Sequence, residues 1–121
     1  MHWGNVENLL TDGRILADRL INTNGAPRVL MALLRSGPTY VKSLTYDTRM
    51  VDKTVRKAIS ILVEMKLVQI HPAPDTKHPH AKEYYALTPN GKDIALALIE
   101  CHEVMISHMS RIVKQSKLKQ E

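Results

Sequence analysis

Hydrophobic residues recur every three or four positions over most of this chain, a spacing that predicts helices. Residues 5–23 and 26–36 show it first, and Asn24-Gly25 separates the two stretches as a stop signal. Gly13 interrupts the first pattern and weakens it, because glycine costs about 1 kcal/mol inside a helix. We therefore expect an N-terminal helix followed by a second helix that packs into the core.

Two further helices are predicted across a short turn, over roughly residues 40–46 and 52–66. The second has an apolar face opposite a face of basic and hydroxyl side chains. The apolar face consists of Val55, Ala58, Ile59, Leu62 and Met65, and the polar face of Lys53, Arg56, Lys57 and Ser60. A helix of this kind suits the DNA major groove, where its cations neutralise phosphates and its arginine can read guanine edges.

The spacing changes to that of short strands after this helix. Residues 67–70 predict one strand and residues 84–87 its return strand. The segment between them, 71–82, holds three prolines and no apolar periodicity, so it predicts a loop. A hairpin with a basic loop, directly after a helix that exposes cations, is typical of a wing.

Thr88-Pro89 reads as the N-cap and first-turn proline of a long helix that runs to about residue 116. Two adjacent apolar stripes follow it. One stripe consists of Ile94, Leu98, Cys101, Met105, His108 and Ile112, and the other of Ala95, Ile99, His102, Ile106, Met109 and Val113. One stripe can pack on the chain's own core, and the other then needs a partner.

The second stripe predicts a homodimer, with the N-terminal helix as its companion in the interface. We expect dimerisation through Leu98, Cys101, Met105, Ile106, Met109 and Ile112. The alternative is a single helix buried broadly in the domain's own core. A two-fold dimer would present two DNA-reading helices about one turn of DNA apart, ~34–36 Å, and so predicts a roughly palindromic site.

Residues 44–68 resemble the helix-turn-helix of winged-helix transcription regulators, and residues 85–95 resemble the segment that closes the wing in regulators of the MarR and PadR type. The first match rests on apolar residues at family positions, namely Leu44, Met50, Val55, Ile59, Leu62, Leu67 and Val68. The second rests on the pattern Tyr-x-Leu-Thr-x-x-Gly, at Tyr85, Leu87, Thr88 and Gly91. Together they cover roughly residues 28–95.

The resemblance implies a mainly α fold with a small β-hairpin, a winged helix-turn-helix with long N- and C-terminal dimerisation helices. It also implies sequence-specific binding of double-stranded DNA and regulation of transcription, with repression by occlusion as the default mechanism. We expect one domain over residues 1–121, with the N-terminal helix in 1–25, the winged-helix core in 26–88 and the dimerisation helix in 89–118.

The turn between the two motif helices departs from the family pattern. Such turns usually carry a glycine one residue before the position of Met50, because the backbone there favours positive φ, whereas this chain has Arg49. The family often has a small polar cap where Val51 stands, and the best N-cap candidate is instead Asp52. The start of the recognition helix is therefore open by about one residue.

The expected DNA contacts lie on the two motif helices, their turn and the loop of the wing. Arg56 is the first choice for reading a base, since its planar fork can bind guanine bidentately, and Lys53 and Lys57 are expected at phosphates. The alternatives are an ordinary solvated helix face and a surface loop that contacts nothing. The full set is Lys42, Ser43, Arg49, Lys53, Thr54, Arg56, Lys57, Ser60, Lys77, His78, His80 and Lys82.

Composition agrees with this interpretation. A net charge of +5 favours a polyanionic partner, and 44% hydrophobic residues support a core that must be aliphatic, because the chain has one Trp, four Tyr and no Phe. A single cysteine excludes an intrachain disulfide and fits a reducing cytoplasm. No apolar run reaches the length that spans a membrane, and we expect no membrane contact.

Metal, cofactor and catalytic sites find little support. His71, His78 and His80 lie close together, but their spacing follows no zinc-site pattern and no cysteine or paired carboxylate completes it. We expect no cofactor and no enzyme activity, since nucleophile elbows, phosphate-cradling glycine loops and HExxH are all missing. A site shared between subunits stays open on the C-terminal helix, at Cys101, His102, Glu103 and His108.

Two other functions stay open. The fold also serves as a protein-interaction module, although the basic face around residues 53–57 favours DNA. A sensor that responds to a metal or another effector is the second. Such an effector is unidentified and would have to bind in the dimer crevice and change the distance between the two DNA-reading helices.

Overall fold

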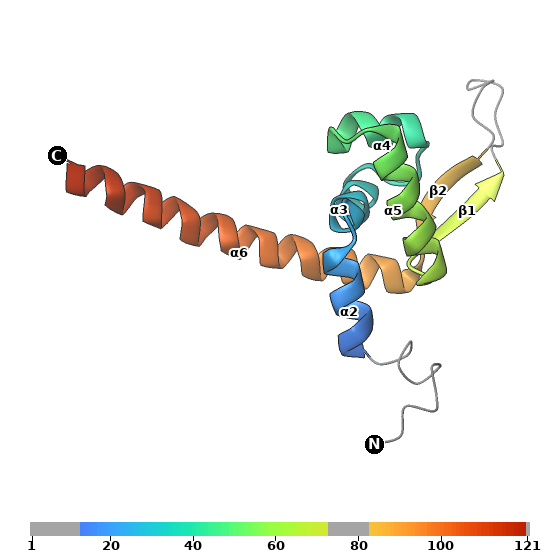
Figure 1. Ribbon diagram of the computed structural model, residues 1–121, viewed down its shortest axis with the longest axis horizontal. Coiled ribbons are helices and arrows are strands. Elements are labelled where there is room, and N and C mark those ends of the chain that lie inside the picture. Colours follow the sequence, from blue (N-terminus) through green and yellow to red (C-terminus); the bar gives the residue numbers. More distant parts are fainter. Residues whose placement is uncertain (1–12, 73–82, 121) are drawn as a thin grey trace, which may run out of the picture.

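The computed structural model describes residues 13–72 and 83–120, which form a small helical domain with a hairpin at one side and a long helix leaving it (Figure 1). The described elements are α2 (Gly13–Asn22), α3 (Ala26–Ser36), α4 (Val41–Thr48), α5 (Asp52–Glu64), β1 (Val68–Pro72), β2 (Glu83–Leu87) and α6 (Pro89–Gln120). This architecture confirms the predicted winged helix-turn-helix with a long C-terminal helix.

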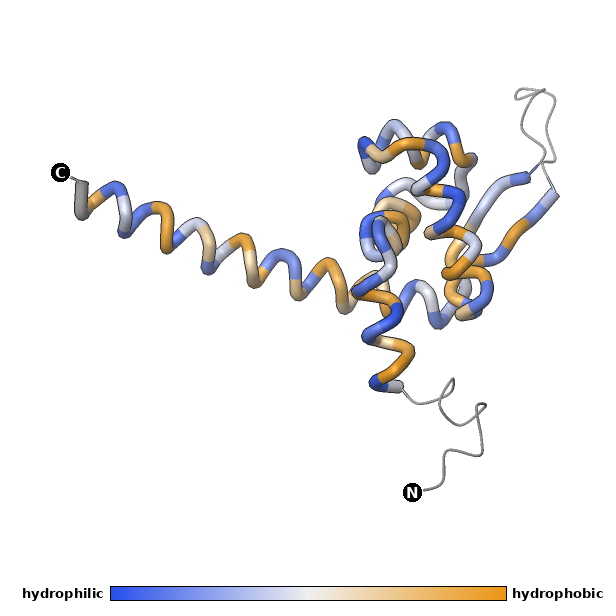
Figure 2. The backbone as a smooth tube through the Cα atoms, in the orientation of Figure 1, coloured by the Kyte–Doolittle hydropathy of each residue, from blue (hydrophilic) through white to orange (hydrophobic). Residues whose placement is uncertain are grey.

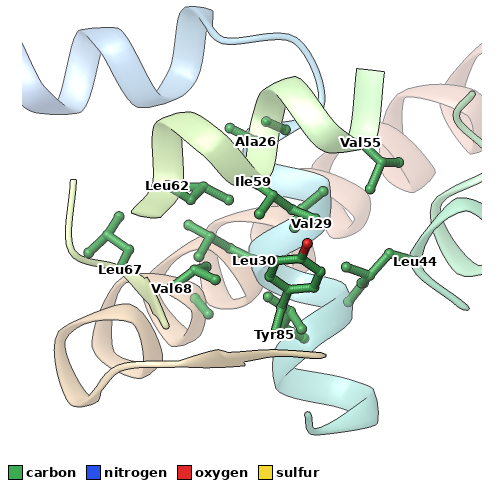
Figure 3. Packing of buried hydrophobic residues seen from close by; sticks show 14 of the residues in the cluster. Ala26, Val29, Leu30, Leu44, Val55, Ile59, Leu62, Leu67, Val68 and Tyr85 are labelled. Carbon is green, nitrogen blue, oxygen red and sulfur yellow. The ribbon is translucent and has the colours of Figure 1, made fainter. Parts of the chain in front are cut away.

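The core lies where α3, α4 and α5 meet the hairpin (Figure 3). It is aliphatic, as composition predicted: Leu30, Leu44, Val55 and Leu62 have no exposed surface. Burying each such side chain contributes about 1.5–3 kcal/mol. Tyr85 is the aromatic member of this core at 6% exposure. The apolar face of α5 is therefore buried in the core, and its opposite face is exposed to solvent.

The wing is a two-stranded antiparallel sheet in which Val68 pairs with Leu87 and Pro72 with Glu83. β1 runs two residues beyond the predicted end of the strand. Proline is tolerated at Pro72 because it stands at the end of the described ladder, where a missing N–H costs little. Thr39 adds a short rung on the other side of β2, since its N–H donates to the carbonyl of Tyr85 at 3.0 Å and the N–H of Tyr85 donates back at 2.7 Å.

The turn between α4 and α5 has the backbone that glycine usually provides, although an arginine occupies it. Arg49 has φ 57° and ψ 33°, in the left-handed region. The expectation that Asp52 caps α5 is wrong. Val51 is the N-cap, in an extended conformation and without a side-chain cap, and Asp52 is the first helical residue. A carboxylate is favourable there because the first turn of a helix carries partial positive charge.

Thr88 and Gly91 fasten the start of α6 to the end of α5. The Thr88 hydroxyl donates to the carbonyl of Lys66 at 2.8 Å and accepts from the N–H of Gly91 at 2.9 Å. The N–H of Thr88 also donates to the carbonyl of Leu67 at 3.0 Å. These bonds confirm Thr88 as the helix N-cap, and they account for the threonine and glycine of the wing-closing motif.

After its first three turns α6 leaves the core and continues alone (Figures 1 and 2). Ala95 is buried, and Leu98 and Ile99 are half-buried, but residues 101–118 are all exposed. The expectation that one stripe packs on the chain's own core is therefore wrong beyond residue 100. The alternative, broad burial of this helix in its own domain, is excluded because residues 101–118 are exposed.

Candidate nucleic-acid interface

The N-terminal half of α5 displays the predicted basic face. Lys53, Arg56, Lys57 and Ser60 are exposed, because the helix buries the positions between them. Within the part of the chain that the structure describes, the ammonium groups of Lys53 and Lys57 form no ion pair. Both are thus available to a polyanion.

Thr54 is turned away from this face. It is half-buried, and its methyl group would lie 3.4 Å from a Cβ placed on Gly25, at the start of α3. Thr54 therefore helps to seat α5 against α3, and less of it is available to DNA than of its neighbours.

The remaining candidates divide between described and undescribed parts of the chain. Lys42 and Ser43 are exposed on α4, and Arg49 is exposed in the turn before α5. The four wing-loop candidates lie outside the described residues: Lys77, His78, His80 and Lys82. The described candidates thus lie on α4, on α5 and in the turn between them, and DNA contact by these residues and by the wing loop stays a prediction.

Arg56 is engaged on one side by Asp52. Its Nε donates to Oδ2 of Asp52 at 2.6 Å, and the two side chains are about 60% exposed (62% and 59%). Hydrogen bonding and the charge of Asp52, with smaller effects of Tyr85 and Glu83, raise the pKa of Arg56, which stays protonated. Sequence reasoning treated Asp52 as a cap and missed this pair, although acid and base four residues apart on a helix are its ordinary signal.

β2 brings a second carboxylate to the same side of α5. The Tyr85 hydroxyl donates to Oε2 of Glu83 at 3.3 Å. The Tyr85 ring lies among aliphatic side chains, with its hydroxyl oxygen toward α5 (Figure 3). Burial first, and then the charge of Glu83, raises the pKa of Tyr85. Two hydrogen-bonded pairs, Asp52–Arg56 and Tyr85–Glu83, therefore lie within electrostatic reach of each other where α5 faces β2.

A second ion pair lies at the C-terminal end of α5. Arg19 of α2 donates to Oε2 of Glu64 at 2.9 Å. The pair sets an end to the basic face, because Glu64 stands on the same side of α5 as Lys53 and Lys57. No local pattern reveals a contact between residues 45 positions apart, so sequence reasoning missed it.

Aromatic rings support the base of the wing. His71 stacks on Tyr84 with ring centroids 4.9 Å apart, and Tyr40 meets Tyr84 edge-on at 6.4 Å. His71 is thus a packing residue of the hairpin. The described ranges hold no cluster of three or more His, Cys, Asp or Glu side chains that could bind a metal ion, and His78 and His80 lie outside them.

The free part of α6 carries the predicted dimer residues. Met105, Ile106, Met109 and Ile112 are 50–59% exposed, and Cys101 is exposed with its Sγ 4.0 Å from the sulfur of Met105. Leu98 differs, since it packs against the core of its own chain. A shallow open hollow is lined by His102, Met105, Ile106, Met109, Ser110 and Val113.

The described helices include no segment with the length and apolar composition that a membrane span needs.

Solved structures share this fold. The adhesin competence repressor AdcR of Streptococcus pyogenes is 24% identical, with a TM-score of 0.66 over 91% of this chain and 79% of that one. ZitR of Lactococcus lactis, a zinc-responsive MarR family member, is 17% identical, with a TM-score of 0.63 over 76% of this chain and 61% of that one. Staphylococcus aureus MarR, solved with salicylate and kanamycin, is 18% identical at a TM-score of 0.58, over 82% of this chain and 63% of that one.

The chain thus spans about three fifths of the length of some of these proteins and four fifths of others. No protein-family model matches the sequence. No protein of curated function matches it either. The chain therefore has the winged-helix fold seen in these MarR-type regulators.

Proposed function

We propose that this chain is a sequence-specific, double-stranded DNA-binding regulator of transcription that works as a homodimer and represses by occupying its site. The observation that carries the proposal is the exposed basic face on the N-terminal half of α5. Lys53 and Lys57 stand there without ion-pair partners in the described chain, and Arg56 lies beside them.

The geometry of α5 favours the DNA major groove as the place of this face. A major groove about 12 Å wide admits one α-helix, and recognition helices read bases with their N-terminal residues. In α5 the free cations lie in that half, while the far end carries the Arg19–Glu64 pair. α4 presents Lys42 and Ser43 beside it, where the first helix of such a motif crosses the DNA backbone.

The free part of α6 supports the homodimer. Exposed apolar side chains along one helix form a surface that monomeric proteins rarely keep in water. A second copy offers an identical helix, so a two-fold pairing covers both apolar surfaces at once. The repressor role is consistent with AdcR, a competence repressor of the same fold, while ZitR responds to zinc and MarR was solved with salicylate.

Selection from a randomised duplex library, followed by fluorescence-anisotropy titration, tests the proposal. We expect a two-fold-symmetric selected site and affinity that falls steeply with salt. Lys53→Ala and Lys57→Ala should each weaken binding and lower the slope of log K against log salt by about 2, because the substitution removes one phosphate contact from each subunit of the homodimer.

Lys114→Ala is the matched control, since it removes an exposed lysine from the free part of α6 and leaves α5 untouched. It should bind as the wild type does. Weak binding without a selected site, or equal losses in Lys114→Ala and Lys53→Ala, would contradict the proposal and favour the protein-interaction function.

A further inference from the structure

Asp52 is an unexpected residue to find on a surface that approaches DNA. Its carboxylate is exposed in the first turn of α5, where it would repel phosphates and lower affinity. The favourable effect of an exposed acid at a helix start is small. A gain in something other than affinity would explain the residue better.

The contact with Arg56 suggests what that gain is. Side chains on a helix lean toward its N-terminus, so Arg56 reaches back over the first turn, where base contacts concentrate. Asp52 meets it there and takes the Nε–H at 2.6 Å. A guanidinium carries five N–H donors. The two terminal nitrogens then remain as a pair of donors, the arrangement that matches O6 and N7 of guanine.

A second carboxylate adds a weaker electrostatic attraction on Arg56. Glu83, held by the Tyr85 hydroxyl at 3.3 Å, acts on Arg56 from β2, while Asp52 acts from α5 itself. A long side chain with freely rotating torsions loses conformational entropy when it binds a base. An arginine already oriented by Asp52 has less to lose, and it has fewer wrong geometries in which to bind another base.

We propose that Asp52 is a positioning residue for base readout, which orients Arg56 toward a guanine. Its charge lowers the affinity for DNA in general, and its contact with Arg56 raises the discrimination between sites. This inference rests on the proposed function. It predicts two effects of opposite sign from one substitution. Removing the carboxylate raises binding to unrelated DNA, because a repulsive charge is gone, and lowers discrimination at the base that Arg56 reads.

The test measures dissociation constants on the selected duplex and on a series in which each guanine is replaced in turn. The proteins are wild type, Asp52→Ala, Asp52→Asn, Arg56→Ala and the double variant Asp52→Ala/Arg56→Ala. We expect Asp52→Ala to cost about tenfold in discrimination at the guanine that Arg56→Ala also affects. The double variant should lose no more than Arg56→Ala, because Asp52 acts through Arg56.

Asp47→Ala provides the matched control. Asp47 is an exposed acid on α4 whose carboxylate bonds to Ser36 at 3.2 Å, so its loss changes the charge equally and leaves Arg56 alone. It should raise binding to unrelated DNA and keep discrimination. Circular dichroism of each variant separates these effects from unfolding, and Asp52→Asn repeats the test with a side chain of the same shape.

The outcomes separate this inference from the function beneath it. If Arg56→Ala loses discrimination and Asp52→Ala does not, the positioning role is overturned while the regulator remains. If Asp52→Ala sharpens discrimination, Asp52 occludes Arg56 and the inference is also overturned. If no protein of the series selects a site, the proposed function fails and the positioning role fails with it.

Discussion

Gly91 lies closer to a neighbouring backbone than any side chain could tolerate. A Cβ at this position would come 2.0 Å from the carbonyl oxygen of Leu67. Gly91→Ala should therefore lower the free energy of unfolding by about 2–3 kcal/mol, since α6 or the end of α5 must move. Urea denaturation measures the loss.

Gly13→Ala is the control for this substitution. A Cβ at Gly13 meets nothing within 4 Å, and the residue lies in α2, so alanine should stabilise the protein by about 0.5–1 kcal/mol or leave it unchanged. An unfolding midpoint of Gly91→Ala equal to that of the wild type would show that the close approach is absent in solution.

Tyr85 makes stability depend on pH in the alkaline range. Its pKa in the folded chain is raised above the ordinary 10.0, so the folded state holds this proton more tightly than the unfolded state. The contribution is complete below the unfolded pKa and is lost as pH rises through the folded pKa. Tyr85→Phe should therefore flatten the alkaline fall in stability, at the cost of the bond to Glu83, about 0.5–1.5 kcal/mol near neutral pH.

Urea midpoints across the alkaline range, from about pH 8 to about pH 11, compare the two proteins. Tyr46→Phe removes a tyrosine hydroxyl from a side chain that is 85% exposed and serves as the control. The same alkaline slope in wild type and Tyr85→Phe would refute the linkage.

At the scale of elements, Thr88 joins three segments: the end of α5, the start of β1 and the start of α6. Thr88→Val keeps the shape of the side chain and removes both hydroxyl bonds, to Lys66 and Gly91. We expect a loss of about 1–2 kcal/mol in unfolding free energy, from the missing N-cap and the stranded carbonyl.

The comparison variant is Thr45→Val, whose hydroxyl bonds at 2.6 Å to Lys42 within its own helix. Its loss should be smaller, because it joins no separate elements. Chemical denaturation of both variants measures the difference. Equal losses would mean that Thr88 acts as an ordinary surface threonine and fastens nothing.

At the scale of the whole molecule, the proposed homodimer depends on the free part of α6. Met109 is 59% exposed in the single chain, and a homodimer would bury it against a second copy. Met109→Asp should therefore dissociate the dimer, because an unpaired charge in such an interface costs several kcal/mol. Sedimentation velocity or light scattering after size exclusion measures the mass directly.

Ser107→Asp introduces the same charge about half a turn round the helix from Met105 and Met109, and should leave the mass unchanged. Dissociation should also weaken binding to a two-fold site, since the two recognition helices then bind independently. A wild type that is monomeric at micromolar concentration would contradict the homodimer.

The periodicity of the sequence was enough to determine the order of the elements, the buried face of α5 and the basic face opposite it. Such patterns are local, since residues three and four apart on a helix share a face wherever the helix lies. The Thr88 cap and its glycine were readable for the same reason. The exposure of Lys53 and Lys57 on α5 was thus predicted, while their contact with DNA stays a prediction.

Contacts between distant segments were decided by the tertiary structure alone. The approach of Gly91 to Leu67 and the Arg19–Glu64 pair each join elements whose separation along the chain leaves no trace in a local pattern. The sequence placed the start of α5 to within one residue, and only its N-cap, Val51 in place of Asp52, differed. Whether the apolar stripes of α6 are buried or exposed depended on how far the core extends along that helix. A periodicity shows which residues share a face of a helix, but it does not show what covers that face.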